Sequence, residues 1–312
     1  MLDGDNVLVT GGAGFVGSQL VETLSEDGAN LLAIDNCFAG SDSLVPDGVR
    51  FERTDIRDDS LPELVREFDP DTILHLAALH YIPYCNDHPE ETFQVNVMGT
   101  RNLLEAAGEA SNLSTVVFAS TAAVYPPREG PNAEGSPTGP MDIYGETKLV
   151  GEDLMQLFAR RTGISTVSAR LFNVFGTNET NDHLIPAIVE QVRRGDRKID
   201  LGNLTPKRDF VHVSDVVEAI TTLAQEFQGG YDTYNVGTGT EYSVREVVEQ
   251  TSEALGEEIE IDQDDDRVRE SDRPHLQADI SRLRREFGWE PSVDLVTGLE
   301  ELLHQEEAVL VT

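Results

Sequence analysis

A tyrosine and a lysine four residues apart, in the segment DIYGETKLVGEDL (142–154), could transfer a proton. At this spacing Tyr144 and Lys148 lie one turn apart on the same face of a helix. The ammonium group would lower the pKa of the phenol, so that a phenolate forms near neutral pH and accepts a proton from an alcohol. The alternative is a half-buried tyrosine beside a solvated lysine, and the pair alone does not decide between the two.

Three glycines, at positions 11, 14 and 17, follow one apolar segment and open a helical one. Gly11 would allow a tight turn, Gly14 would let backbone amides approach a pyrophosphate, and Gly17 would let helix and strand pack closely. Asp35 ends the next apolar segment. Its carboxylate can accept both hydrogen bonds from an adenosine ribose and would repel a 2′-phosphate, which favours NAD over NADP. The alternative is a structural loop in another α/β protein.

These residues need a parallel sheet to position them. Apolar segments typical of buried strands alternate with segments of helical periodicity in the first half of the chain. We expect strands at 6–10, 31–35, 50–54, 72–77, 114–120 and 165–171, and helices at 15–26, about 90–110 and about 142–162. The order strand, helix, strand indicates right-handed βαβ units, and so an α/β fold with a Rossmann-type, doubly wound parallel sheet.

After residue 173 the alternation loosens, which predicts a smaller, discontinuous α/β lobe. A strand in RDFVH is followed by a helix that we expect Ser214 or Asp215 to cap. The predicted division assigns 1–172 and 209–236 to the NAD-binding domain, and 173–208 and 237–312 to the lobe that binds the substrate.

The charge of the chain is strongly acidic, with 58 Asp and Glu against 23 Lys and Arg in 312 residues and a net charge of −35. A nucleic acid is not expected as a partner, because a phosphate backbone requires a basic surface. The acidic residues are scattered along the chain, which favours a solvated surface adapted to a saline cytoplasm, as in a halophile. No apolar segment reaches the ~20 residues of a membrane span, so we expect no membrane partner.

The two cysteines, Cys37 and Cys85, cannot form a disulfide framework, and no signal peptide is evident. Both observations favour the cytoplasm. The segment HYIPYCNDH contains His80, Cys85 and His88, but their spacing matches no common zinc pattern. We therefore predict no metal site.

The motifs TGGAGFVG, HLAA, FASTAAVY and Y-x-x-x-K, in this order, resemble those of the extended short-chain dehydrogenase/reductase family. The later motifs ARLFNVFG, KRDFVHVSDVVEA, YNVGTG and RESDRPHLQADISRLRREFGW are similar to its nucleotide-sugar epimerase and dehydratase branch, most of all to the UDP-glucose 4-epimerases. The resemblance runs from about residue 6 to 304. It implies a UDP-sugar substrate, bound NAD, and a homodimer that pairs the helices at about 90–110 and 144–162 in a four-helix bundle.

The resemblance also implies roles for individual residues. Thr121, Tyr144 and Lys148 are the expected catalytic residues. The expected cofactor-binding residues are Gly11, Gly14, Phe15, Val16, Gly17, Asp35, Asn36, Asp55, Ile56, Leu76, Ala77, Ala78, Asn96, Ser120, Tyr144 and Lys148. The expected substrate-binding residues are His80, Thr121, Asn173, His183, Leu184, Arg208, Arg269, Asp272 and Leu276. Of the latter, Asn173 and Arg208 would hold the diphosphate, and Arg269 and Asp272 would reach the uridine.

The expected reaction is the 4-epimerisation of a UDP-sugar of the UDP-glucose or UDP-galactose type, through a transient 4-keto sugar. Tyr144 would be the base, Thr121 would orient the sugar hydroxyl, and Lys148 would also bind the nicotinamide ribose. NAD would carry the redox chemistry and stay bound.

Other reactions of the branch are less favoured. A 4,6-dehydratase carries Asp-Glu after the threonine, where this chain has Ala122 and Ala123, which cannot transfer protons. Decarboxylases often have a glutamate in this segment, and a reductase would prefer NADPH, which Asp35 disfavours. Epimerisation of UDP-N-acetylglucosamine or UDP-glucuronate remains open, as does a non-catalytic NAD-binding sensor.

Two positions depart from the pattern of the 4-epimerases. His80 replaces a lysine common near the pyrophosphate, which removes a point charge. Leu276 replaces a bulky tyrosine that restricts the pocket of some members to unmodified hexoses. Because leucine is smaller, N-acetylated sugars are expected to fit as well.

Overall fold

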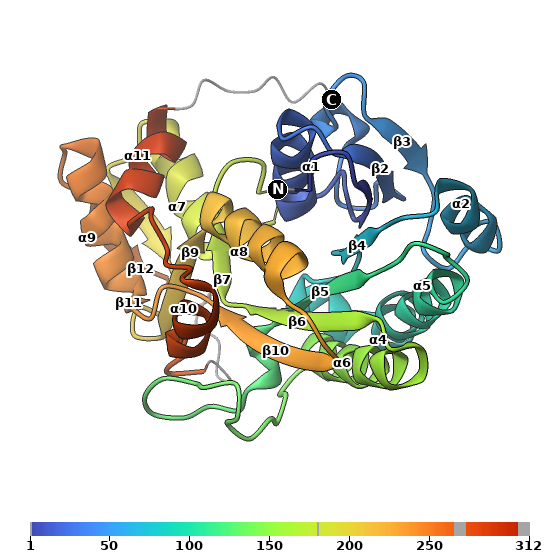
Figure 1. Ribbon diagram of the computed structural model, residues 1–312. Helices are drawn as coiled ribbons and strands as arrows, with labels where there is room; N and C mark the ends of the chain where they lie inside the picture. Colours follow the sequence, from blue (N-terminus) through green and yellow to red (C-terminus); the bar gives the residue numbers. More distant parts are fainter. Residues whose placement is uncertain (1, 180, 265–272, 305–312) are drawn as a thin grey trace.

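The computed structural model describes residues 2–179, 181–264 and 273–304. Figure 1 shows a large twisted sheet with helices around it and, beside it, a smaller lobe that contains α7, α9 and α11. The large sheet has seven parallel strands in the order β10-β6-β5-β4-β1-β2-β3. Their bounds are β1 Asn6–Thr10, β2 Asn30–Asp35, β3 Arg50–Arg53, β4 Thr72–His75, β5 Thr115–Thr121, β6 Ser165–Leu171 and β10 Tyr231–Val236. The predicted Rossmann-type fold is confirmed.

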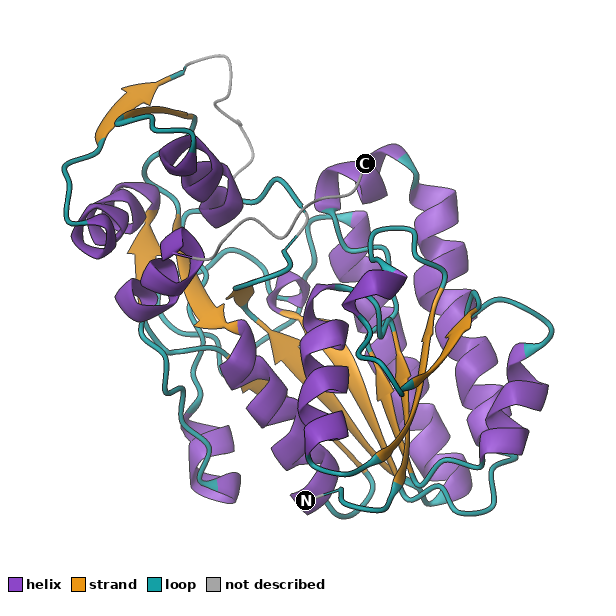
Figure 2. Ribbon diagram, turned by 90° about the horizontal axis from the view of Figure 1, so that it is seen from above, coloured by secondary structure: helices purple, strands orange, loops and turns teal. Residues whose placement is uncertain are grey.

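Helices cover both faces of this sheet, as the view from above shows (Figure 2). The helices α1 (Phe15–Glu26), α8 (Val213–Glu226) and α10 (Ser281–Phe287) pack into one core cluster, and α2 (Leu61–Phe68), α5 (Thr100–Ala107) and α6 (Ile143–Thr162) pack into the other. Alternate strand residues enter opposite clusters: Val7 and Val9 lie in the first, and Leu8 lies in the second. Both faces of β1 are therefore buried, which is why its sequence shows no polar alternation.

The strand order reverses beside β1, which pairs with β2 on one side and β4 on the other. The chain leaves β1 toward α1 and leaves β4 toward the loop at Leu76, so the two connections diverge at the carboxyl ends of the strands. In open α/β sheets ligands bind at such a point.

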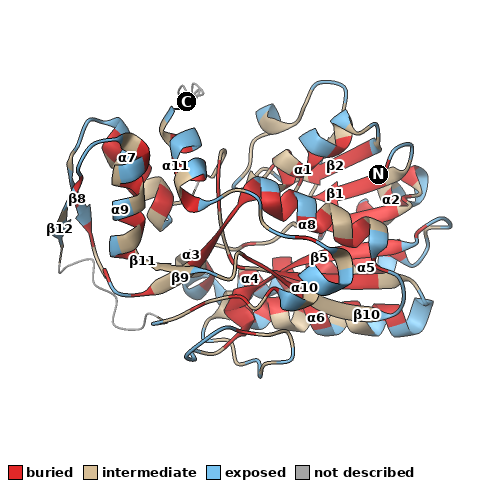
Figure 3. Ribbon diagram, turned by 60° about the vertical axis from the view of Figure 1, so that its left-hand side comes forward, coloured by how far each residue is buried: buried red, intermediate tan, exposed pale blue. Residues whose placement is uncertain are grey.

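The smaller lobe has its own sheets and core. A three-stranded sheet has the order β11-β9-β7, and β8 pairs with β12. The bounds are β7 Asn173–Phe175, β8 Lys198–Leu201, β9 Lys207–His212, β11 Glu241–Ser243, β12 Glu260–Gln263, α7 Leu184–Arg193, α9 Val244–Leu255 and α11 Leu295–His304. Residues such as Phe175, Ile188, Val247 and Leu299 are fully or almost fully buried between these elements (Figure 3).

Several details differ from the sequence predictions. The helix expected at about 90–110 is divided into α4 (Pro89–Phe93), a π-helical turn at Gln94–Gly99 and α5. The predicted cap of α8 is wrong: the N-cap residue is His212, whose ring accepts a hydrogen bond from the Ser214 amide. Asp215 is instead buried and accepts hydrogen bonds from Ser292.

Two elements also sit differently from the predicted domain division. The boundary at 209 cuts β9, which belongs entirely to the small sheet. The helix α10 packs on the core of the large sheet, although its residues fall in the range predicted for the smaller lobe. Within the described residues, no helix has the length and apolarity needed to cross a membrane.

A buried ion pair fixes α6 on the large sheet. Arg170 of β6 and Glu152 of α6 are joined by two hydrogen bonds of 2.8 and 2.6 Å, and both side chains are almost fully buried. Glu152 also accepts a 2.6 Å hydrogen bond from the Ser120 hydroxyl. The pair therefore positions the helix relative to the end of β5.

Replacing Glu152 with glutamine should lower the free energy of unfolding by about 3–5 kcal/mol, because the buried guanidinium loses its compensating charge. Urea unfolding in molar KCl measures this. The matched control is Glu105→Gln, whose pair with Arg101 is exposed and contributes less than about 0.5 kcal/mol. Equal effects of the two substitutions on the free energy of unfolding would contradict the role given to the buried Arg170–Glu152 pair.

Candidate active site

The glycine loop between β1 and α1 is packed too closely for side chains. Gly11 has a φ of +74°, and a Cβ there would lie 2.7 Å from the Ala77 nitrogen. A Cβ on Gly17 would lie 1.9 Å from the carbonyl oxygen of Gly11. Gly14 is the N-cap of α1, and no side chain caps this helix end. The backbone amides of the first turn are thus left to bind an anion.

Carboxylates order the loops that follow β2 and β3. Asp35 accepts hydrogen bonds from the amides of Ala13 and Cys37, at 3.1 and 2.7 Å, so the glycine loop and the end of β2 are held together. Asp55 accepts hydrogen bonds from the Arg57 guanidinium and from the side-chain amide of Asn36. The hydrogen bonds from Arg57 lower the pKa of Asp55 to about 2, against the opposing effect of burial.

One cavity of about 1050 Å³ connects the glycine loop to the smaller lobe. The predicted residues that line it are Gly11, Gly14, Phe15, Val16, Gly17, Asp35, Asn36, Asp55, Ile56, Leu76, Ala77, Ala78, His80, Ser120, Thr121, Tyr144, Lys148, Asn173, His183, Leu184, Arg208 and Leu276. Asn96 does not line it; its amide is buried and bonds both backbone groups of Leu79, so it fixes the wall from behind. Arg269 and Asp272 lie outside the described residues.

Tyr144 and Lys148 lie on the first turns of α6. The N-cap residue of the helix is Asp142, whose side chain accepts a 2.7 Å hydrogen bond from the Gly145 backbone amide. Lys148 is only 3% exposed, which excludes the solvated lysine considered from the sequence. Its Nζ donates to the Ala119 carbonyl oxygen at 2.8 Å and lies 4.6 Å from the centre of the Phe118 ring. Burial lowers the pKa of Lys148 to about 7.

Burial raises the pKa of Tyr144 above its ordinary value in the chain by itself, and the opposing effect comes from a hydrogen bond with Thr121. The Lys148 Nζ lies 5.9 Å from the centre of the Tyr144 ring and hydrogen-bonds the backbone of β5. That Lys148 lowers the pKa of Tyr144 when the cofactor is bound stays a prediction.

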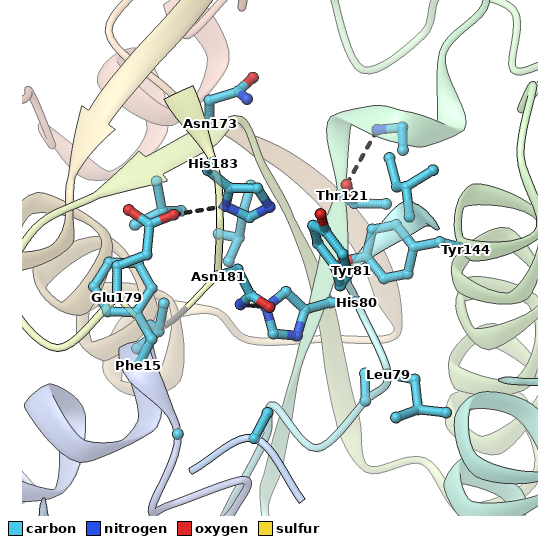
Figure 4. Close-up of a pocket in the computed structure, with 18 of the residues that line it drawn as sticks. Phe15, Leu79, His80, Tyr81, Thr121, Tyr144, Asn173, Glu179, Asn181 and His183 are labelled. Atoms are coloured by element: carbon cyan, nitrogen blue, oxygen red, sulfur yellow. Dashed lines mark hydrogen bonds and ion pairs between the residues drawn. The ribbon is translucent and has the colours of Figure 1, made fainter. Parts of the chain in front are cut away.

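The cavity is also lined by polar residues that the sequence did not single out. Glu179 and Asn181 lie between β7 and α7, and Tyr81 follows His80 after β4. Figure 4 shows Glu179 directed at His183 and Asn181 directed at His80. A sequence signal existed for one pair, because Glu179 and His183 are four residues apart next to the FNVFG motif.

Arg273 is a second residue that the sequence reasoning missed. Its side chain is 10% exposed, and its Nη2 donates to the Ala123 carbonyl oxygen and to Asp142, both at 3.1 Å. It thus connects the segment that carries Leu276 to the start of α6. No cluster of metal ligands is present among residues 2–179, 181–264 and 273–304.

A glycine loop at a strand-order reversal, with Tyr144 and the buried Lys148 lining the same cavity, defines the extended short-chain dehydrogenase/reductase class. The comparison with family models is more specific: residues 7–237 match the NAD dependent epimerase/dehydratase family, and the chain belongs to it.

Individual relatives cover nearly the whole chain. The UDP-glucose 4-epimerase of Streptomyces lividans is 35% identical over 303 residues, with 91% of each chain covered. The solved UDP-glucose 4-epimerase of Thermus thermophilus, in complex with NAD, superposes with a TM-score of 0.87 at 32% identity and covers 95% of this chain and 97% of its own. The UDP-N-acetylglucosamine 4-epimerase of Methanobrevibacter ruminantium, in complex with UDP-N-acetylmuramic acid, gives 0.88 at 28% identity, with 96% and 97% covered.

The depressed pKa of Lys148 has a consequence for stability. Between pH 7 and about 10 the unfolded lysine binds a proton that the folded one has lost, so stability rises with pH. In protein stripped of nucleotide, Lys148→Met should reduce this rise between pH 7 and 9 by about 1 kcal/mol per pH unit. Urea unfolding across this range measures it, with the exposed Lys198→Met as the control. Identical slopes for Lys148→Met and the unsubstituted protein would contradict the prediction.

Proposed function

We propose that this protein interconverts the C4 epimers of a UDP-sugar and retains NAD through each turnover. The observation that carries the proposal is that Tyr144 and Lys148 line the same cavity as the glycine loop, with Lys148 buried and bonded to the end of β5. The activities of the relatives point to the same chemistry. We also propose that the large sheet holds the cofactor and the smaller lobe holds the sugar nucleotide.

The residues present fit NAD. The amides at the start of α1 suit a pyrophosphate, and the Asp35 carboxylate suits an adenosine ribose, since its two oxygens still have lone pairs free. Lys148 has three N–H donors, of which one is used on Ala119, so two are available to a ribose. When bound, NAD supplies the reversible oxidation of the alcohol carbon and, in its oxidised form, a positive charge that favours the phenolate.

The chain's own residues move the proton. Tyr144 takes the proton of the C4 hydroxyl as the 4-keto sugar forms and returns it to the new epimer. Thr121, whose hydroxyl accepts a 3.1 Å hydrogen bond from the Ala123 amide, is held in place to orient the sugar hydroxyl. Burial raises the pKa of Tyr144 in the chain alone, and the positive charge of the oxidised cofactor would act in the opposite direction.

Dehydration finds no support in the residues around Thr121. Ala122 and Ala123 follow it and are both buried, and neither can exchange a proton. A non-catalytic sensor is disfavoured for a different reason: Thr121, Tyr144 and Lys148 are all present and line one cavity. Epimerisation needs only the proton carrier that Tyr144 provides.

We propose UDP-glucose and UDP-galactose as substrates, with N-acetylated UDP-sugars also accepted. Leu276 is 6% exposed and lines the cavity beside Arg208 and Arg273. Its side chain is smaller than the tyrosine expected to restrict the pocket to unmodified hexoses. The relative from Methanobrevibacter ruminantium, which is named for UDP-N-acetylglucosamine, supports this wider range.

A homodimer is proposed through the helices around α6. The side chains of Phe93, Met98 and Leu157 are 38%, 42% and 49% exposed on α4, the π-helical turn and α6. Apolar groups on these helices suit a four-helix interface between two copies. A saline cytoplasm is proposed from the net charge of −35 and from two cysteines that remain free thiols.

Nuclear magnetic resonance of the products tests the proposed reaction. UDP-glucose, UDP-N-acetylglucosamine and UDP-glucuronate are incubated separately with purified protein in molar KCl, with no cofactor added. We expect the 4-epimer of UDP-glucose and of UDP-N-acetylglucosamine. A protein that carries NAD and forms no epimer from any of the three would overturn the proposal.

Tyr144→Phe should lower kcat by about 10²- to 10⁴-fold, because it removes the proton carrier while the ring still packs. The content of bound NAD should stay within twofold of the unsubstituted protein, which separates the chemical step from cofactor binding. A variant that keeps more than a third of kcat would exclude Tyr144 as the base.

Leu276→Tyr should lower the ratio of kcat/KM for UDP-N-acetylglucosamine to that for UDP-glucose by about tenfold or more, since the larger ring competes with the acetamido group. Leu276→Met has nearly the volume of leucine and should leave the ratio unchanged. A ratio that does not respond to tyrosine would show that another wall selects the sugar.

A further inference from the structure

A buried carboxylate that lines the cavity is paired with a histidine. The Glu179 side chain is 4% exposed, and its Oε1 lies 2.6 Å from Nδ1 of His183. Both residues line the cavity. Burial raises the pKa of Glu179, and the influences that oppose this rise all come from His183. A carboxylate in such a place is costly unless it is paired, so the pairing with His183 compensates the burial of Glu179.

The neighbouring histidine is arranged differently. His80 is bonded by Asn181, whose amide nitrogen lies 2.9 Å from Nε2 of the ring. Burial lowers the pKa of His80 to about 4, so this ring is neutral at pH 7 and its Nε2 accepts the hydrogen bond. His80 and His183 thus line the same cavity. Among the described residues, His183 is paired with a carboxylate and His80 with an amide.

His183 stands where an anionic group would meet the smaller lobe. It is the N-cap residue of α7, a ten-residue helix whose start is not capped by a side chain. Its ring lies 5.9 Å from that of Tyr81, on the opposite side from Glu179 (Figure 4). Arg208 lines the same cavity. The start of a helix, a guanidinium and an imidazole together favour an anion, and a UDP-sugar carries its negative charge on the diphosphate.

We propose that Glu179 is a positioning residue for substrate binding: it fixes the His183 ring through Nδ1 and directs Nε2 to the diphosphate of the UDP-sugar. In the complex the imidazole lies between two anions, and each accepts one of its N–H groups. A ring that donates from both nitrogens is protonated, so substrate binding draws a proton from solvent whenever free His183 is neutral.

This inference rests on the proposed function for the identity of the ligand. It adds a role for Glu179, which need not contact the substrate, and the uptake of a proton when the substrate binds. The charged and titratable residues that line the cavity near His183 in the chain or on the facing elements are Glu179 and Asp182 from its own segment, His80 and Tyr81 from the loop after β4, and Arg208 from β9. Glu179→Gln changes only the first of these groups.

The test uses NAD-loaded protein in molar KCl and UDP as the probe. Isothermal titration at pH 8 in buffers of different ionisation enthalpy gives both the affinity and the number of protons taken up. For Glu179→Gln we expect UDP binding about tenfold weaker, proton uptake reduced by at least half, and the KM for UDP-glucose raised about tenfold. Bound NAD and kcat should stay within twofold.

Two further variants sharpen the result. His183→Asn keeps a donor at this position, and UDP should still bind but without proton uptake. Glu241→Gln is the matched control, because Glu241 pairs with His275 at 2.8 Å and neither residue lines the cavity. It should leave affinity and proton uptake unchanged. If Glu179→Gln does not fold, the loss of uptake in His183→Asn decides the question.

The inference is overturned if Glu179→Gln binds UDP with unchanged affinity and uptake, or if it loses NAD and kcat as much as UDP affinity, which a merely structural role would cause. It is also overturned if uptake persists in His183→Asn. If no UDP-sugar is epimerised but UDP binds with Glu179-dependent uptake, the proposed reaction fails while the inference holds. If UDP does not bind at all, both fail.

Discussion

The burial of the Lys148 ammonium against the end of β5 is the constraint on which the rest of the site depends. Lys148 is 3% exposed and its Nζ donates to the Ala119 carbonyl oxygen, which requires α6 to lie very close to the sheet. Glycines make this approach possible: a Cβ at Gly151 would lie 2.5 Å from the Phe118 ring, and one at Gly145 would lie 2.6 Å from the Ala123 carbonyl oxygen. The lowered pKa of Lys148 is the cost of this position.

The part of the cavity that the smaller lobe lines depends on a buried carboxylate of that lobe. Asp209 of β9 accepts hydrogen bonds from the amides of Thr238, Gly239 and Ala278. Its own amide donates to the Leu276 carbonyl oxygen. These bonds tie the segment that carries Leu276 to β9, which also carries Arg208. One network therefore sets the distance between the residues proposed to select the sugar and those proposed to hold its diphosphate.

The sequence predicted the large sheet well because both faces of its strands are buried and its loop motif has a strict packing requirement. The strands from Asn6 to Leu171 agree with the predicted ranges to within a few residues. Prediction from the sequence failed where tertiary contacts decide the local structure. The cap of α8 is a histidine rather than Ser214, because Asp215 turns inward to bond Ser292. The helix expected at about 90–110 contains a π-helical turn, and the residue types in this segment give no signal that predicts it.

In the candidate site too, some residues could be predicted from the sequence and others could not. The cavity-lining residues of the glycine loop and α6 follow from motifs, whereas Arg273 and Tyr81 lie in segments without periodicity and meet the site only in the folded chain. The pKa of Tyr144 could not be predicted from its spacing to Lys148, because the backbone of β5 takes the ammonium and burial dominates the phenol. Spacing fixes which groups are neighbours, and the surrounding packing decides their charge.

In the proposed reaction, the hydrogen removed from C4 of the sugar returns to the same carbon without exchange with water. UDP-glucose carrying deuterium at C4 tests this directly, by mass and nuclear magnetic resonance analysis of the UDP-galactose formed after many turnovers in molar KCl. We expect full retention of deuterium at C4 of the product. Loss of deuterium to water, or product that forms only when NAD is added in stoichiometric amount, would contradict it.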